Sequence, residues 1–583
     1  MNSIVRTRVM ISLLVAALIF LLGPGLLRAG NTAASPKTPK LVVVIVIDQM
    51  RADYLDRFAD LYGKNGFGLL TTKGAVFTDC EYGYASTYTG PGHATILSGI
   101  PVRAGGIIGN EWYDRNKQRV VYCVEDSSVK SVGISPEQIA GRMSPANFLG
   151  STLGDQLLDA SPSSRVIGIA IKDRGAILLA GRHPTGALWF DPQSGKWISS
   201  SYYYRALPSW VGRFNAANIA EGYLGRTWTP LLPDSCYARA GVDDAPGEGT
   251  LPGEDRPVFP HVVRDLAGGG IPSNSLRRFD AMLPTPFGDE LTVKFAEAAL
   301  DGEELGQRGV PDLLAVSFSS LDYCGHIFGP DSREMEDLLV RLDGSLRELF
   351  SFIDARVGLG NVAIVLTADH GVCPLPEKKI TRDAMRIDPK DFLLDVRVRV
   401  GQELNYNEGD ENLILALSNS FLYLDRKKIE SRGFTFANFE KVVIGAASRE
   451  RGVLRCYTRE ELENAFAGAG SRDTAGQLIA KSLNPGRSGD IAVLIDQYSF
   501  FSGGTTGTTH GSPWYYDRHV PLLFFGPGIA PGKQGAGSRP NDIAPTLAKL
   551  LGVPPPPGSD GTVLGIFPGG GPDAAATLLQ GEK

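Results

Sequence analysis

Six side chains of metal-binding types are spaced along this chain, together with one threonine in a small-residue turn. Carboxylates and imidazoles supply oxygen and nitrogen ligands, and three of each are enough for two divalent ions that each keep an open position. A hydroxyl group between two such ions would be activated as a nucleophile without a neighbouring base. These residue types therefore predict a catalytic site with two metal ions. The candidates are Asp48, Asp322, His326, Asp369, His370 and His510, with Thr89 as the nucleophile.

The local spacing of these residues favours convergence on ions. Asp322 and His326 are four residues apart, so one helical turn or a tight loop can aim both at one ion. Asp369 and His370 are adjacent and followed by Gly371, and His510 lies in a loop of small residues. Each pattern alone is weak, and the indication of a metal site comes from the whole set.

Five short apolar runs, of which 41–47 consists largely of β-branched residues, predict strands that are buried on both faces. Such strands are typical of the middle of a parallel sheet. Amphipathic segments alternate with them and predict helices at 53–63, 288–300, 333–356 and 541–551. The predicted strands are 41–47, 166–171, 313–318, 362–366 and 522–525.

This alternation predicts an α/β fold with a doubly wound, mostly parallel sheet flanked by helices. Ligands of such sheets bind beyond the carboxyl ends of the strands. Asp48, Lys172, Asp322 and Asp369 fall at or just after the ends of the predicted strands. Position and chemistry therefore agree on one site at that edge.

Two stretches interrupt the alternation and predict insertions. Residues 186–285 are rich in aromatic residues, Pro and Gly, and we expect an irregular insertion near the active site. Residues 390–490 predict a small α+β insertion, with strands at 421–424 and 491–495 and helices at 436–447, 459–466 and 474–482. The catalytic core is expected at 38–185, 286–389 and 491–565, and residues 566–583 form a tail.

The N-terminal residues 1–34 have the pattern of an export signal. Arg6 and Arg8 precede an apolar stretch from Val9 to Leu22, and small residues follow it. The stretch is shorter than a membrane span, which needs about 20 residues. We therefore expect a periplasmic or secreted protein, with the membrane as a partner only if the segment stays uncleaved.

Composition excludes some classes of function. The 583 residues are 43% hydrophobic and 21% charged, which is typical of a globular protein. The net charge is −6 and no run is strongly basic, so a nucleic-acid partner is not expected. Six cysteines without CxxC spacing leave disulfide pairing open.

Together the candidate residues resemble the alkaline phosphatase superfamily, and more narrowly its single-chain, phosphate-irrepressible alkaline phosphatases with a Thr nucleophile. The resemblance covers nearly all of residues 40–565. It rests on Val-Ile-Asp48-Gln-Met-Arg, Thr89-Gly-Pro-Gly-His93, Asn110-Glu-Trp-Tyr113, Lys172-Asp-Arg174, Thr-Ala-Asp369-His370-Gly and Asp542-Ile-Ala-Pro-Thr-Leu-Ala.

The resemblance implies two zinc ions and a ligand set for each. The first zinc would be held by Asp322, His326 and His510. The second would be held by Asp48, Asp369 and His370, with Thr89 bound to it as the nucleophile that forms a covalent phosphothreonine. From the ligand types alone, manganese or iron is not excluded.

The resemblance also assigns three residues to the transferred phosphoryl group: Asn110, Lys172 and Arg174. A monoester carries extra negative charge on its nonbridging oxygens, which cationic donors stabilise. Lys172 occupies the place where some relatives hold a third metal, so no Mg²⁺ at a third site is expected. His93 is expected to make structural hydrogen bonds near the nucleophile.

These observations predict an exported, monomeric phosphatase that hydrolyses small phosphate monoesters with broad leaving-group tolerance. The nearest alternative is a nucleotide pyrophosphatase or phosphodiesterase of the same superfamily. A sulfatase lacks support, because no Cys/Ser-x-Pro-x-Arg segment stands at the nucleophile position. A non-catalytic, metal-bound binding protein is the alternative from a different class.

Overall fold

The computed structural model describes residues 38–268, 276–406, 412–468 and 473–568. The predicted signal segment 1–34 lies outside the described residues. Of the predicted tail, only residues 566–568 are described. Within the described segments, no helix has the length and apolar character that a bilayer span requires.

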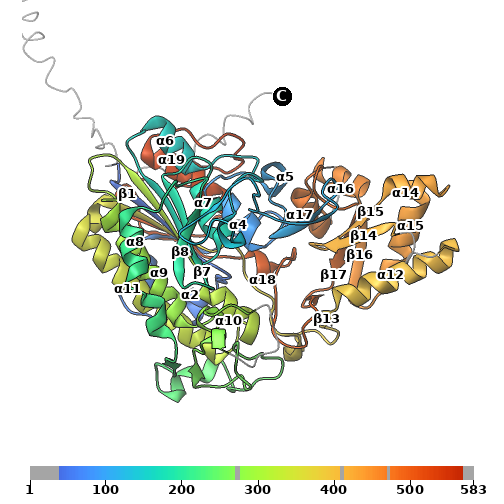
Figure 1. The fold of residues 1–583 in the computed structure, drawn as a ribbon, viewed down its shortest axis with the longest axis horizontal. Coiled ribbons are helices and arrows are strands. Elements are labelled where there is room, and N and C mark those ends of the chain that lie inside the picture. Colours follow the sequence, from blue (N-terminus) through green and yellow to red (C-terminus); the bar gives the residue numbers. More distant parts are fainter. Residues whose placement is uncertain (1–37, 269–275, 407–411, 469–472, 569–583) are drawn as a thin grey trace, which may run out of the picture. The chain divides into compact units, whose positions relative to one another are not determined.

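A large mixed sheet runs through the protein (Figure 1). Its strands run in one direction except for β19 and β8, because β19 runs against both β12 and β2, and β8 runs against both β7 and β5. Across the sheet, the order of the ten strands formed by described residues is β20 (Gly532–Gln534), β2 (Ala75–Phe77), β19 (Leu522–Phe525), β12 (Val362–Thr367), β1 (Leu41–Ile47), β11 (Asp312–Phe318), β6 (Val166–Ala170), β7 (Gly186–Asp191), β8 (Lys196–Ser200) and β5 (Ser131–Val132).

The predicted strands are confirmed with boundary differences of at most one residue. Each residue of the central strand β1 is fully buried, which explains why this strand has no polar alternation. The register pairs Ile47 of β1 with Phe318 of β11, and Val46 with Thr367 of β12. Neighbouring parallel strands therefore end at the same level.

Helices cover both faces of this sheet. Figure 1 shows α9 (Pro286–Gly302) and α11 (Arg333–Arg356) on one face, with α6 (Leu153–Ala160), α7 (Asp173–Ala180) and α19 (Ile543–Leu551) on the other. The fold is therefore the predicted doubly wound α/β type. The other helices of the core are α2 (Tyr54–Arg57), α3 (Phe67–Lys73), α4 (Thr89–Ile96), α5 (Val102–Gly105), α8 (Ser209–Ala216), α10 (Ser320–Phe328) and α18 (Tyr515–Arg518).

One predicted helix is wrong in length. Residues 53–63 form a helix only over α2, and turns follow. The carboxylate of Asp343 on α11 accepts hydrogen bonds from the backbone N–H groups of Gly63 at 2.8 Å and Phe67 at 2.7 Å. These tertiary contacts hold the chain in a non-helical path that the local pattern does not reveal.

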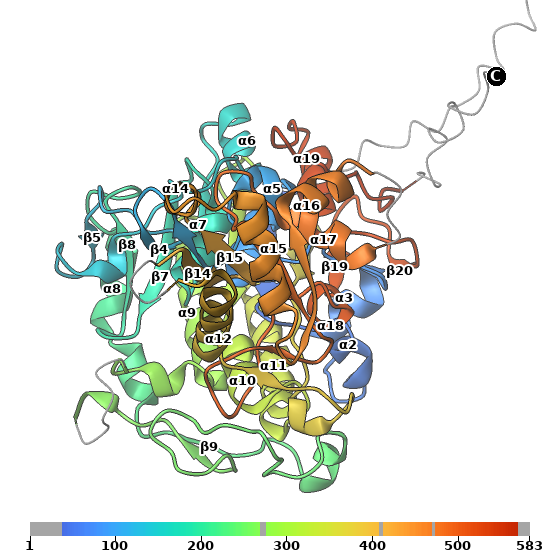
Figure 2. The same ribbon diagram turned by 90° about the vertical axis from the view of Figure 1, so that its right-hand side faces the viewer.

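A second, four-stranded antiparallel sheet lies in the insertion (Figure 2). Alternate side chains of its strands enter two hydrophobic clusters: Leu422 and Leu424 pack with α12 and α15, whereas Phe421 and Tyr423 pack with α16 and α17. Its elements are β14 (Ile414–Ser418), β15 (Phe421–Leu424), β17 (Ile491–Ile495), β16 (Val453–Thr458), α12 (Pro389–Leu404), α14 (Arg426–Ser431), α15 (Phe436–Ala447), α16 (Arg459–Phe466) and α17 (Thr474–Ser482).

Two predicted boundaries need correction. The core does not end at residue 185, because β7 and β8 extend the main sheet beyond it. Their aromatic side chains, taken as a sign of an irregular insertion, are core residues: the ring of Trp197 stacks on Phe295 of α9 at 3.9 Å between centroids. The other insertion does not end at residue 490, because β17 is an inner strand of its sheet.

Gly92 of α4 sets how closely this helix approaches the main sheet. A Cβ atom there would lie 2.3 Å from the carbonyl oxygen and 2.6 Å from the Cβ of Asp369. We predict that Gly92→Ala lowers the free energy of unfolding by about 1–3 kcal/mol, because the contact is overpacked. Chemical denaturation measures this.

Gly445 on α15 is the matched control, because no heavy atom lies within 4 Å of a Cβ built there. Gly445→Ala should raise the free energy of unfolding by about 0.5–1 kcal/mol, because alanine gives the unfolded chain less conformational entropy than glycine does. Equal effects of the two substitutions would contradict the close-packing argument.

Candidate functional site

The candidate residues meet at the carboxyl edge of four neighbouring parallel strands. Asp48 follows β1, Lys172 follows β6, and Asp369 follows β12. Asp322 lies in the first turn of α10, which begins two residues after β11 ends. Because these strands end at the same level, four polar side chains from distant parts of the sequence converge.

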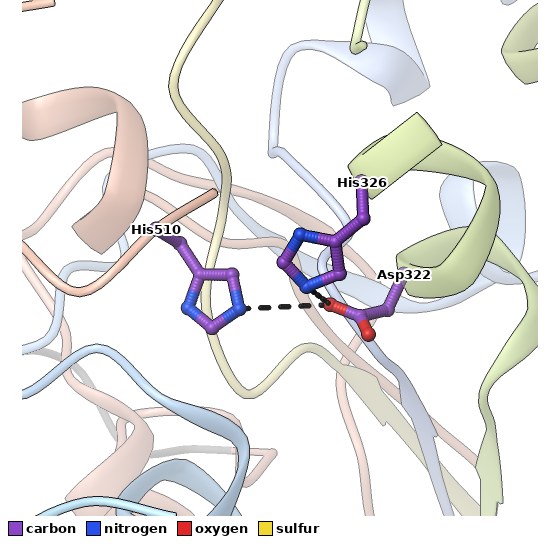
Figure 3. Close-up of side chains that lie close together, drawn as sticks. All are labelled: Asp322, His326 and His510. Atoms are coloured by element: carbon purple, nitrogen blue, oxygen red, sulfur yellow. Dashed lines mark ion pairs between the residues drawn. The ribbon is translucent and has the colours of Figure 1, made fainter. Parts of the chain in front are cut away.

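The first group of possible metal ligands consists of Asp322, His326 and His510. Figure 3 shows both imidazoles pointing at the same carboxylate oxygen. The Nε2 atom of His326 lies 3.2 Å from Oδ1 of Asp322, and that of His510 lies 3.7 Å from it. One helical turn of α10 presents the first two residues, as the four-residue spacing predicts.

Backbone carbonyl groups orient both imidazoles of this group. The Nδ1 atom of His326 is 2.8 Å from the carbonyl oxygen of Thr508, and that of His510 is 2.7 Å from the carbonyl oxygen of Thr87. An Nδ1–H donor in each ring leaves Nε2 as the nitrogen that faces the carboxylate. In a neutral ring of this tautomer, Nε2 has the lone pair that can bind a metal.

The second group contains Asp48, Asp369 and His370, all fully buried. The Nε2 atom of His370 lies 3.5 Å from Oδ1 of Asp48 and 3.4 Å from Oδ2 of Asp369. None of these three atoms has a hydrogen-bond partner among the described residues, although the Nδ1 atom of His370 is 2.9 Å from the carbonyl oxygen of Gly371. Unpaired buried polar atoms are costly, so three that face one another fit a bound cation.

The two groups adjoin each other. The rings of His370 and His510 stack with centroids 3.5 Å apart. In the described part of the chain, the ligand atoms cluster as three overlapping sets: Asp322, His326 and His510; Asp48, Asp322 and His370; and Asp48, His93 and Asp369. The six predicted residues are thus brought together, and His93 lies beside them.

His93 has both ring nitrogens engaged. Its Nδ1 atom is 2.8 Å from the carbonyl oxygen of Thr89 and its Nε2 atom is 2.8 Å from the hydroxyl of Ser317. Nδ1 also lies 3.1 Å from Oδ2 of Asp369. These contacts fit the hydrogen-bonding role predicted for His93.

Charge balance distinguishes this site from an ordinary buried ion pair. Three buried carboxylates, those of Asp48, Asp322 and Asp369, surround a single ammonium group. This group belongs to Lys172, which contacts Asp48 at 2.7 Å and also Asp322. Burial and the repulsion of the other two carboxylates raise the pKa of Asp48 well above its ordinary value. A cation would remove this repulsion.

The pKa values of two imidazoles, those of His510 and His370, are lowered. Burial, together with the neighbouring rings of His370 and His326, lowers the pKa of His510 well below its ordinary value. Burial also lowers the pKa of His370, more than the nearby carboxylates raise it. Both rings are therefore neutral and have a lone pair to offer. Buried carboxylates with neutral imidazoles are a donor set that fits zinc.

Thr89 is the first residue of α4 and only 1% exposed. An Nη2 group of Arg174 lies 3.4 Å from its hydroxyl oxygen. The backbone N–H of Gly90 donates to Oδ1 of Asn110 at 2.8 Å, which leaves the amide N–H₂ of Asn110 as the group free to face a ligand. The Nε–H group of Arg174 is buried and has no hydrogen-bond partner in the described segments.

Sequence reasoning missed Gln49 and Tyr122. The side chain of Gln49 donates to Asp322 at 2.8 Å and its backbone N–H donates to Asp369 at 3.1 Å, which its left-handed backbone (φ 69°) permits. Its place directly after Asp48 was a usable signal, but the backbone conformation is not visible in the sequence. Tyr122 is 3.0 Å from Arg174 and had no sequence signal.

The six cysteines, all in described segments, are unpaired, and five of them are buried. Cys324 and Cys373 are neighbours in sequence of ligand candidates, but neither belongs to a metal-compatible group among the described residues. They pack in the core beside the site, as expected for buried thiols.

Comparison with known proteins places the chain in a family. The type I phosphodiesterase / nucleotide pyrophosphatase family matches residues 42–515. The chain is 36% identical to the alkaline phosphatase PafA of Elizabethkingia meningoseptica over 539 residues, covering 92% of this chain and 96% of that protein. It is 38% identical to the alkaline phosphatase PhoV of Synechococcus elongatus over 527 residues, covering 90% and 92%.

A crystal structure of PafA has the same fold, with a TM-score of 0.83 at 34% identity, over 91% of this chain and 99% of that chain. The likeness extends over the core and the insertion, since so little of either chain is left unmatched. The chain therefore belongs to the alkaline phosphatase superfamily, matches its type I phosphodiesterase / nucleotide pyrophosphatase family, and is an enzyme of the alkaline phosphatase type.

Proposed function

We propose that this protein is an exported phosphatase that hydrolyses phosphate monoesters with broad leaving-group tolerance, through a covalent phosphothreonine on Thr89. The observation that carries the proposal is the position of the Thr89 hydroxyl, at the start of α4 and 3.4 Å from Arg174. The contiguous groups of carboxylate oxygens and imidazole nitrogens support it. Export rests on the pattern of residues 1–34, and a periplasmic or secreted location follows from it.

Two zinc ions would complete the site. Asp322, His326 and His510 would hold the first. Asp48, Asp369 and His370, with Thr89, would hold the second. Bound there, the ions would lower the pKa of the Thr89 hydroxyl and stabilise the negative charge of the departing alkoxide. The ammonium group of Lys172 already occupies the space between Asp48 and Asp322, so we propose no Mg²⁺ at a third site.

The chain's own residues would perform two displacements. In the first, the Thr89 oxygen bonds to phosphorus as the ester P–O bond breaks, and the alcohol leaves. In the second, water attacks the phosphothreonine and frees Thr89 and phosphate. Burial of Thr89 excludes bulk water from the first step, so that transfer to the side chain precedes hydrolysis.

Asn110, Lys172 and Arg174 would bind the nonbridging oxygens of the phosphoryl group. Arg174 has a buried Nε–H group without a partner and an Nη2 group beside Thr89, so it already offers donors at the position of attack. The cationic donors Lys172 and Arg174 stabilise the negative charge on a monoester, which is greater than that on a diester. They support a monoesterase over a diesterase.

The second candidate function is a nucleotide pyrophosphatase or phosphodiesterase. The observation in its favour is the description of the matching family, which names these activities. A panel of a phosphate monoester, a phosphate diester and a sulfate ester, assayed on metal-replete protein, separates the two candidates. We expect the monoester to be preferred by kcat/KM and the protein to be monomeric.

Removing the cationic donors tests the substrate class. We predict that Lys172→Ala and Arg174→Ala each lower kcat/KM for a monoester by at least about 100-fold, as expected for loss of a charge-assisted contact to the transition state. Diester hydrolysis should fall much less. Steady-state kinetics on both substrates measures this, and equal losses on both would reject the monoesterase assignment.

Removing the metals tests the mechanism. Chelation should abolish activity and lower the unfolding temperature, because the buried carboxylates then repel one another without a cation. Added zinc should restore both, and elemental analysis should find about two zinc ions per chain.

Thr89→Ala separates metal binding from catalysis. We expect the variant to keep zinc at the sites lined by Asp and His side chains, and to lose monoesterase activity. An active Thr89→Ala variant would contradict the assigned nucleophile. A wild-type protein that holds zinc but acts on no phosphate ester would instead support the binding-protein alternative.

A further inference from the structure

The small hairpin formed by β3 (Glu111–Asp114) and β4 (Arg119–Tyr122) borders the site. Its register pairs Glu111 with Tyr122, and the N–H of Cys123 donates to the carbonyl oxygen of Asn110 at 2.9 Å. The open end of the hairpin therefore brings Tyr122 close to the chain segment that carries Asn110.

The phenol of Tyr122 links two residues of the β6–α7 junction. It accepts a hydrogen bond from Nη1 of Arg174 at 3.0 Å and donates one to Oδ1 of Asp173 at 2.5 Å. The same Asp173 oxygen accepts the backbone N–H of Arg174 at 2.6 Å. Burial raises the pKa of Tyr122 well above its ordinary value, so the phenol keeps the proton that it donates.

This geometry matters because an arginine side chain has many rotamers. Ordering such a side chain costs conformational entropy. Among the described residues, the only side chains that hydrogen-bond the Arg174 guanidinium are Tyr122 and Thr89. Tyr122 thus fixes one end of the guanidinium, while Nη2 reaches Thr89 and Nε stays unpaired.

We propose that Tyr122 is a positioning residue for monoester hydrolysis, which holds the Arg174 guanidinium beside the Thr89 hydroxyl. It acts through Arg174 and does not itself touch the substrate. The proposal rests on the proposed function, because it requires Arg174 to bind the phosphoryl group. An ordered guanidinium would need no reorganisation when charge develops in the transition state.

Tyr122→Phe tests the proposal, because it removes one hydroxyl group and keeps the ring. We expect kcat/KM for a monoester to fall by about 10- to 100-fold, the range for a lost hydrogen bond to a charged group. Affinity for inorganic phosphate, measured by competitive inhibition, should fall as well. Diester hydrolysis should change by less than about threefold, within the weakest neutral hydrogen-bond effects.

Two controls make the result decisive. The buried hydroxyl of Tyr203 has no hydrogen-bond partner in the part of the chain that the structure describes, so Tyr203→Phe should leave both activities unchanged. In an Arg174→Ala background, Tyr122→Phe should have no further effect, because its partner is gone. Unfolding by denaturant checks that all variants are folded.

The outcomes separate the positioning role from the proposed function. If Arg174→Ala reduces monoester hydrolysis selectively but Tyr122→Phe does not, the positioning role is wrong and the function stands. The positioning role would also be overturned if Tyr122→Phe lowered kcat/KM equally for monoester and diester. It would be overturned as well if Tyr122→Phe caused the same fold-loss in the Arg174→Ala background as in the wild-type protein. If Arg174→Ala itself is unselective, the proposed function fails first.

A second feature carries an independent inference about Asn110. The turn between β14 and β15 has Asn419 and Ser420 in the left-handed region, with φ 49° and 61°. Nδ2 of Asn419 donates to the carbonyl oxygen of Glu111 at 2.6 Å. Its amide also covers Gly109, where a Cβ atom would lie 2.4 Å from both amide heteroatoms. The side chain thus spans the backbone on both sides of Asn110.

Other contacts tie the same hairpin to the insertion. The rings of Tyr113 and Tyr423 lie 5.5 Å apart, and Arg115 pairs with Asp490 at 2.8 Å. We infer that the β14–β15 turn positions the Asn110 amide, which makes the insertion part of the active-site support. This inference also rests on the proposed role of Asn110 in phosphate binding.

Asn419→Gly removes the amide but keeps a residue that favours the left-handed backbone. We expect kcat/KM for a monoester to fall by about 2- to 10-fold, the range for one neutral hydrogen bond. Asn405, at the end of α12 with φ 54°, provides the matched control, and Asn405→Gly should be silent. In an Asn110→Ala background, Asn419→Gly should have no effect, and a loss of the same size there would reject the inference.

Discussion

Three carboxylates are buried together at the carboxyl edge of the main sheet, and the rest of the site is arranged around their charge. Asp48, Asp322 and Asp369 follow neighbouring parallel strands whose register ends them at one level. One ammonium group, that of Lys172, contacts two of them, and neutral imidazoles complete the surroundings. Burial of unbalanced charge is costly, so a bound cation would stabilise this cluster.

Around this cluster, the fold supplies donors from less regular parts of the chain. The start of α4 presents Thr89, the β6–α7 junction presents Arg174, and the segment before β3 presents Asn110. None of these groups lies on a strand, and each is held by contacts from another element. The β3–β4 hairpin links two of them through Tyr122 and the backbone next to Asn110. In the proposed function, selectivity for monoesters depends on how rigidly these donors are held.

Sequence patterns predicted the regular part of the fold because burial dictates composition there. The strand 41–47 and the helices 333–356 and 436–447 match β1, α11 and α15, since each has a continuous or periodic apolar pattern. The predictions failed where tertiary contacts decide the path. Asp343 holds the chain at Gly63 and Phe67, beyond the end of α2, and the aromatic residues of β7 and β8 were mistaken for an irregular insertion although they form two core strands. At the site, residue types and strand ends predicted which ligand candidates meet. The positive φ of Gln49 and the hydrogen bonds of Tyr122 could not be predicted, because they depend on packing between distant segments.

The account depends most on transfer of the phosphoryl group to Thr89 beside the buried carboxylates. The most direct test is to quench zinc-loaded protein with acid during turnover of a phosphate monoester and to locate phosphate by peptide mass spectrometry. The account predicts phosphate on Thr89 in the wild-type protein and no phosphopeptide in Thr89→Ala. Phosphate on a different residue, or full turnover without phosphate on Thr89 at any quench time, would contradict it.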